Sequence, residues 1–210
     1  MRETTAPCSS CIRTTAHKVL HERSVTEEDR TTRYAMLECS GCRRVSLQEH
    51  VIIDEEVEVN FYPSPVSRRE PDWLLSLVIG LKGDESDGVL GSLLHEIYQA
   101  VHGGQHRLAA MGIRALLEQV MVSKVGDLGS FEKQLNAFQD AGYISFIQRD
   151  AMKATLEVGH ATMHRAFRPS EQDLKVALDV VEGIMAPLYA HHSDAEKMAE
   201  RIPPRPRRKI

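Results

Sequence analysis

The spacing of apolar residues divides the chain into a strand-like first part and a helical remainder. Short segments rich in β-branched residues, separated by polar ones, fill residues 1–62, and the clearest strand candidates are 45–53 and 57–62. From Asp87 onward, apolar residues recur three and four positions apart, as they do on one face of a helix. The pattern therefore predicts an α+β chain in which strands precede helices.

Boundary signals separate the helical part into individual helices. Ser145 is followed three residues later by Gln148, and Ser170 by Asp173, and both pairs have the spacing of a capping box. Each segment has one apolar face, which predicts an antiparallel bundle of four to five helices. Pro187 should kink the last helix near its end. Helices are expected at about 87–101, 105–125, 130–142, 145–168 and 170–188. A continuous apolar seam on the last one consists of Leu174, Leu178, Val181, Met185 and Leu188.

Proline-rich stretches mark the boundaries between the predicted parts. Residues 62–71 contain three prolines, which interrupt both helices and central strands. We therefore expect a strand domain at 1–62, a linker and docking segment at 63–86, a helical bundle at 87–200 and a disordered tail at 201–210. The tail has five basic residues and no acidic one. It is either a solubilising end or a contact for nucleic-acid phosphates, with the candidate side chains Arg205, Arg207, Arg208 and Lys209.

Composition narrows the class of protein. Aromatic residues make up only 5% of the 210 residues, so the core must be aliphatic, and a net charge of -4 excludes a uniformly basic nucleic-acid coat. The N-terminus lacks the apolar segment of a secretory signal. The longest nearly apolar run, 73–81, is about half the length that spans a bilayer. We therefore expect a cytoplasmic protein with no membrane partner.

The four cysteines form two pairs. Cys8 and Cys11 make one CxxC motif, and Cys39 and Cys42 make the other. Two such pairs supply four thiolates, the ligand set of a tetrahedral structural Zn²⁺ site. The intervening residues have room for two strands, so the sequence predicts a small zinc ribbon. A redox motif, a disulfide pair or free thiols are the alternatives, although no βαβ pattern accompanies either motif. With four thiolates available, His17 and His21 are expected on the ribbon surface.

Two histidines lie close together on a predicted helix. His160 and His164 are four residues apart and therefore share a face. Gly159 removes side-chain volume and should let another helix approach closely. Three interpretations remain open. The pair could bind a metal, although no HExxH pattern is present. It could perform acid–base chemistry on a phosphodiester. Otherwise, the imidazoles serve only helix packing.

Arg114 and Glu118 are candidate partners on a preceding helix. They are four residues apart in an otherwise apolar surrounding. They form either an ion pair at the helix surface or part of a polar site between helices. In the second arrangement, Glu118 beside His164 would raise the histidine pKa. Arg114 would then offer a guanidinium for phosphate or carboxylate.

Taken together, these motifs resemble a known family. The order of a two-CxxC ribbon, a Tyr-Pro-x-Pro linker, an Arg-x3-Glu helix and a Gly-His-x3-His helix is similar to domain of unknown function 4145, a family regarded as similar to the HEPN helical fold. The family usually has asparagine where this chain has His160. Its members are known beside restriction and other prokaryotic defence proteins. The resemblance therefore implies a HEPN-like bundle and a setting in antiviral defence or stress.

The resemblance also implies a test for catalysis. HEPN ribonucleases use an Arg-x4–6-His motif, often paired across a dimer. The three positions that could precede His164 hold Gly159, Val158 and Glu157, so the arginine is absent. We therefore expect a non-catalytic zinc-containing binding module, forming a homodimer, whose partner is nucleic acid or a protein. The alternatives are a metal-independent ribonuclease with a relocated arginine, Arg114 or Arg165, and a purely structural subunit that dimerises through the Leu174–Leu188 seam.

Overall fold

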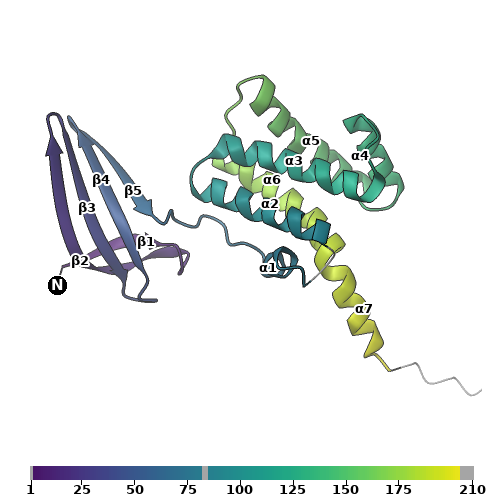
Figure 1. Ribbon diagram of the computed structural model, residues 1–210, viewed down its shortest axis with the longest axis horizontal. Helices are drawn as coiled ribbons and strands as arrows, with labels where there is room; N and C mark the ends of the chain where they lie inside the picture. Colours follow the sequence, from purple (N-terminus) through teal and green to yellow (C-terminus); the bar gives the residue numbers. More distant parts are fainter. Residues whose placement is uncertain (1, 82–84, 204–210) are drawn as a thin grey trace, which may run out of the picture. The chain divides into compact units, whose positions relative to one another are not determined.

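The computed structural model describes residues 2–81 and 85–203 (Figure 1). The chain divides into two compact units, the first ending at Arg69 and the second beginning at Glu70. The division falls within the segment 63–86 that was expected to link two domains. Within the described residues, no helix is long and apolar enough to cross a membrane.

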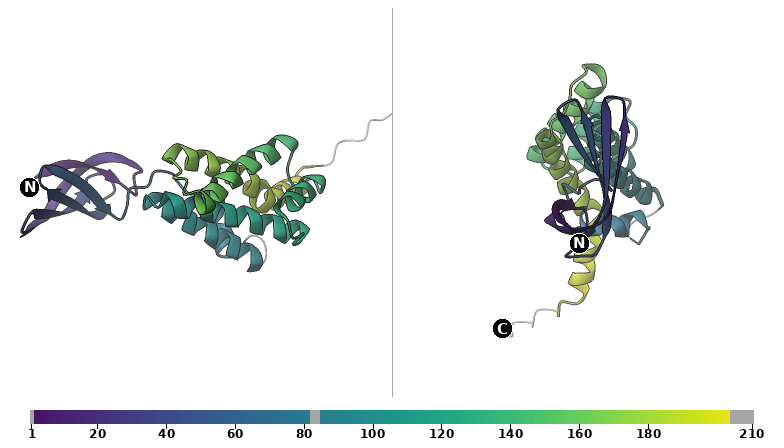
Figure 2. Two further views of the ribbon diagram at one scale, coloured as in Figure 1. Left: turned by 90° about the horizontal axis from the view of Figure 1, so that it is seen from above. Right: turned by 90° about the vertical axis from the view of Figure 1, so that its left-hand side faces the viewer.

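The first unit is an antiparallel meander. Over the described residues it forms one five-stranded sheet in which each strand pairs with the next along the chain. The sheet is strongly curled, as Figure 2 shows. Its strands are β1 (Glu3–Cys8), β2 (Arg13–Glu27), β3 (Arg30–Cys39), β4 (Val45–Ile53) and β5 (Glu56–Tyr62).

The long β2–β3 hairpin dominates this unit but contributes little to a core. The hairpin turns at Glu28, whose φ is 40°, and the only buried residue of β2 is His17. The buried apolar cluster of the sheet consists of Ala6, Ala35 and Leu37, with Val19 and Phe61 packed against it. So small a core supplies little hydrophobic stabilisation, which means that the unit depends on other interactions.

The second unit is helical and is built around one central helix. Helix α3 packs against α2, α4, α5 and α6 (Figure 1). Its apolar face, which includes Ile113 and Leu117, is fully buried. The α-helices of the described residues are α1 (Asp72–Val78), α2 (Glu85–His102), α3 (His106–Val125), α4 (Phe131–Asp140), α5 (Phe146–His164), α6 (Glu171–Met185) and α7 (His192–Glu200).

Local signals in the sequence define several helix starts. Ser145 and Gln148 form the predicted capping box of α5, and Ser170 and Asp173 form that of α6. Both predictions are confirmed, because the serine oxygen accepts from the backbone of the third helical residue and that residue's side chain accepts in return. The expected disturbance near Pro187 is a six-residue π-helical segment, η1 (Ala186–His191), between α6 and α7.

The predicted fold class is wrong in detail. It foresaw a small four-cysteine zinc ribbon followed by four to five helices of a HEPN-like bundle. The chain instead has a curled five-stranded sheet, and α1, η1 and α7 add to the helices that were expected. The two strands expected between the CxxC motifs are present as β2 and β3, but the length of β2 was not foreseen. This strand is almost wholly exposed and therefore has no buried face to produce alternating apolar residues.

Candidate functional site

The four cysteines lie on two turns of the sheet that have the same construction. Cys8 ends β1 and Cys39 ends β3. In one turn, the amide of Ile12 donates to the carbonyl of Cys8 at 2.8 Å. In the other, the amide of Arg43 donates to the carbonyl of Cys39 at 2.9 Å. Both donors have positive φ, 52° and 63°. We refer to residues 8–13 and 39–44 as the two cysteine turns.

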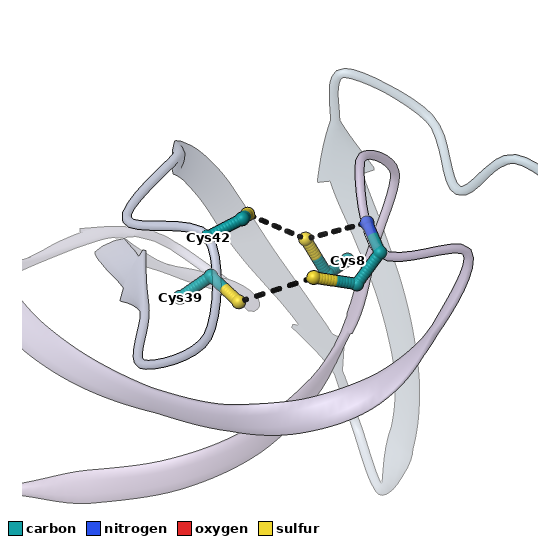
Figure 3. Close-up of side chains that lie close together, drawn as sticks. Cys8, Cys39 and Cys42 are labelled. Carbon is teal, nitrogen blue, oxygen red and sulfur yellow. Dashed lines mark hydrogen bonds between the residues drawn. The ribbon is translucent and has the colours of Figure 1, made fainter.

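The antiparallel meander brings these turns to the same end of the sheet. His17 of β2 pairs with Cys39 of β3, and the amide of Ser40 donates to the carbonyl of Ala16 at 2.9 Å. Figure 3 shows Cys39 and Cys42 on one turn facing Cys8 on the other. The predicted convergence of the two CxxC motifs is therefore confirmed.

The sulfur positions fit a single tetrahedral ion. All four Sγ atoms lie within 4.8 Å of one another. The Cys8 and Cys42 sulfurs are 3.5 Å apart, and those of Cys11 and Cys39 are 3.9 Å apart. Bond lengths of about 2.3 Å to a tetrahedral Zn²⁺ place sulfurs about 3.8 Å from each other. The donor set therefore fits a four-thiolate metal centre, with two buried and two half-buried ligands.

Hydrogen bonds shift the pKa values of Cys11, Cys39 and Cys42 in different directions. The Thr15 hydroxyl lies 3.2 Å from the Cys39 sulfur and is the main reason that the pKa of Cys39 falls to about 5. The Arg44 backbone lowers the pKa of Cys42. The hydrogen bond with Cys42, followed by burial, raises the pKa of Cys11 to about 12. Crowded thiols resist joint ionisation unless a cation compensates the charge.

One residue near the four cysteines differs from expectation, and another was not foreseen. His17 is 1% exposed rather than on the surface, and its Nδ1 lies 3.0 Å from the carbonyl oxygen of Thr15. His21 is exposed, as expected. Thr15 was not singled out from the sequence, since its role depends on the pairing of β2 with β3 and no local pattern reveals it.

The histidine stretch packs closely against α3. Gly159 is buried, and a Cβ built on it would lie 2.9 Å from the carbonyl oxygen of Ala110 and nearer still to the Cβ of Arg114. The expectation that this glycine admits a neighbouring helix is therefore confirmed. A shallow hollow of about 310 Å³ opens beside this contact. It is lined by Arg114, Phe131, Glu132, Lys153, Leu156, Glu157 and His160.

The predicted polar residues meet only in part. His160 is half-buried at the hollow, whereas His164, the last residue of α5, is exposed. Their ring centroids are 4.7 Å apart. Glu118 pairs with Arg114, with 2.7 Å between Oε1 and Nη2. Of the two alternatives for these residues, the ion pair along one helix is therefore the one that forms.

Charged groups around the hollow are already engaged. Arg165 forms an ion pair with Glu157, and Glu132 interacts with Lys153 and Arg149 at 3.4 and 3.1 Å. The sequence did not point to Glu132 or Lys153, because they come from separate helices. The candidate tail residues Arg205, Arg207, Arg208 and Lys209 lie outside the described residues.

Comparison with known proteins assigns the helical unit. The model of the family described as Domain of unknown function (DUF4145) matches residues 95–202, just over half of the chain. The cysteine turns lie outside the matched range. No curated protein and no solved structure matches the chain. On the strength of the family match, the chain belongs to the family Domain of unknown function (DUF4145).

Proposed function

We propose that this protein is a non-catalytic binding module whose sheet is stabilised by Zn²⁺. The observation that carries the proposal is the convergence of four thiol groups within 4.8 Å of one another. Four thiolates saturate a tetrahedral ion and leave no position open for water or substrate, which is the arrangement of a structural rather than a catalytic zinc.

The zinc would contribute stability where the sheet has little of its own. Cys8, Cys11, Cys39 and Cys42 would hold the ion. The ion would then tie the end of β1 to the end of β3, next to a core of only three buried apolar residues. Binding free energy of this kind is folding free energy, because an unfolded chain has no preformed site.

The helical hollow supports binding more than catalysis. Hydrolysis of a phosphodiester needs a cationic group to stabilise developing negative charge. Arg165 directly follows His164, Arg114 lines the hollow with His160, and each arginine is paired with a glutamate. A guanidinium neutralised in this way is a weak stabiliser of a second anion.

One observation favours a metal-independent ribonuclease as a second candidate. Arg114 and His160 line the same hollow, so a relocated arginine beside a histidine is geometrically conceivable if the Glu118 pair opens. The test is incubation of the purified, zinc-loaded chain with structured and single-stranded RNAs. Intact RNA is expected. Cleavage that disappears in a His160→Ala or Arg114→Ala variant would establish the ribonuclease instead.

The biological setting is part of the same proposal. The family resemblance supports a cytoplasmic protein of a prokaryotic defence or stress system, with nucleic acid or a protein as its partner. A homodimer remains a prediction, to be measured by sedimentation. The Leu174–Leu188 seam is not available as the dimer surface, because Leu174, Leu178 and Met185 are already buried within this chain. A homodimer would have to use another surface.

A further inference from the structure

The cysteine turns carry a concentrated set of exposed arginines. Arg13 follows the first CxxC motif, and Arg43 and Arg44 follow the second. All three are exposed. Residues 4–21 and 39–48 contain no Asp or Glu. Within the described part of the chain, Arg13 and Arg44 have no ion-pair partner, and Arg43 has only Glu38 at 4.0 Å.

The backbone fixes the position of each of these arginines. Arg13 pairs with Cys8 in the β1–β2 ladder. The amide of Arg43 donates to Cys39, and the carbonyl of Arg44 accepts from the Cys39 amide at 2.9 Å. Guanidinium groups on a rigid backbone lose less entropy when they bind than groups on a mobile tail do. Exposed Ser10 and Ser40 add hydroxyl groups to the same turns.

Resting on the proposed function, we propose that the two cysteine turns bind the phosphate backbone of a nucleic acid through Arg13, Arg43 and Arg44. Arginine is suited to phosphate because its planar fork donates two parallel hydrogen bonds. Serine hydroxyls also donate commonly to phosphate oxygens. An acidic protein surface is the competing partner, and the experiment below separates the two.

The three arginines determine the sign of the net charge at this end of the sheet. A zinc ion with four thiolates carries about two negative charges, which three arginines exceed by about one. Without them, this end of the sheet would repel a polyanion. Neutralising all three should therefore weaken binding strongly, since this end of the sheet would then carry a net negative charge like the protein as a whole, which is acidic at -4.

The test measures affinity and its salt dependence for the full, zinc-loaded chain. The probes are a single-stranded RNA, a single-stranded DNA and a duplex DNA of about 20 nucleotides. Three phosphate contacts contribute a slope of about -2 in log K against log salt for single strands, or roughly twentyfold weaker binding between about 50 and 200 mM salt. The variant Arg13→Gln/Arg43→Gln/Arg44→Gln should bind at least about tenfold more weakly, with a slope shallower by about 2.

A matched control removes the same charge from the same sheet. Arg23, Arg30 and Arg33 are exposed and lie roughly 15–30 Å along the strands from the cysteine turns. The variant Arg23→Gln/Arg30→Gln/Arg33→Gln should bind as the parent does. Equal losses in both variants, or none in the first, would overturn the proposal. So would a parent that leaves all three probes unbound, which would direct the search to a protein partner.

Zinc content and folding are measured on the same preparations. About one zinc per folded chain in every variant assigns a failed binding result to the arginines alone. If the parent chain contains no zinc, the proposed function is contradicted, and a failure to bind nucleic acid is then explained by the missing metal.

Discussion

A Cβ placed on Gly159 would lie 2.6 Å from the Cβ of Arg114, so α5 and α3 meet here with no room for a side chain. Substitution of Gly159 by Ala should lower the free energy of unfolding by about 1–3 kcal/mol, the usual cost of overpacking a buried contact. Denaturant titration followed by helical circular dichroism measures this change.

Gly183 provides the matched control for that substitution. It lies exposed in α6, and a Cβ there would meet nothing within 4 Å. Gly183→Ala should raise stability by about 0.5–1 kcal/mol, because alanine is the better helix former. Equal effects of the two substitutions would show that helix propensity, and not the contact with Arg114, determines the result at Gly159.

Removal of zinc should unfold one unit and spare the other. On the proposed function the sheet depends on the four-thiolate centre, whereas the helical unit has a large apolar core of its own. Chelation, or Cys39→Ser, should therefore abolish the dispersed amide signals of residues 3–62 in an NMR spectrum. The helical circular dichroism should persist. Ser40→Ala is the control, and a metal-free chain that retains its strand signals would contradict the structural role of zinc.

The cap of α6 should make stability depend on pH. Hydrogen bonds from the side chain and backbone of Ser170 lower the pKa of Asp173. A depressed carboxyl pKa stabilises the folded state above the ordinary Asp value, and the contribution is lost as pH falls through the folded value. Ser170→Ala should cost about 0.5–2 kcal/mol near neutral pH and less at about pH 3.

The other capping box separates titration from capping itself. Ser145 pairs with Gln148, a side chain that does not titrate. Ser145→Ala should therefore destabilise α5 by a similar amount at both pH values. If the cost of Ser170→Ala were equally constant, Asp173 would not be the titrating partner.

The Arg114–Glu118 pair should contribute modestly to stability. Arg114 is 22% and Glu118 36% exposed, so Glu118→Gln should cost about 0.5–1 kcal/mol. Another pair with the same spacing, His192 with Glu196, is largely exposed, and Glu196→Gln should change stability by a few tenths of a kcal/mol at most. Thermal unfolding of the two variants provides the comparison. A larger cost at Glu196 would contradict this account.

The sequence was informative where a local pattern determines the structure. β4 begins and ends at Val45 and Ile53 as predicted, and both capping boxes form, because their chemistry involves neighbouring residues. The two CxxC motifs correctly indicated that the four cysteines lie close together, because their spacing is that of one four-thiolate site. Gly159 was correctly expected to admit another helix.

Features that depend on distant residues could not be predicted in this way. β2 buries only His17, so its fifteen residues lack the alternation that marks a strand. Thr15 acts on Cys39 only because β2 and β3 pair. The helical hollow joins side chains of three helices, and Lys153 and Glu132 have no shared signal in the sequence.

The position of the cysteine turns has a consequence for the exposed β2–β3 hairpin. A hairpin closed only by the turn at Glu28 would separate progressively from its open end, because only a small buried cluster holds that end together. Zinc bound as proposed would tie β3 to the β1–β2 turn at that same end. The ladder would then be closed at both ends, and fraying would have no free terminus from which to begin.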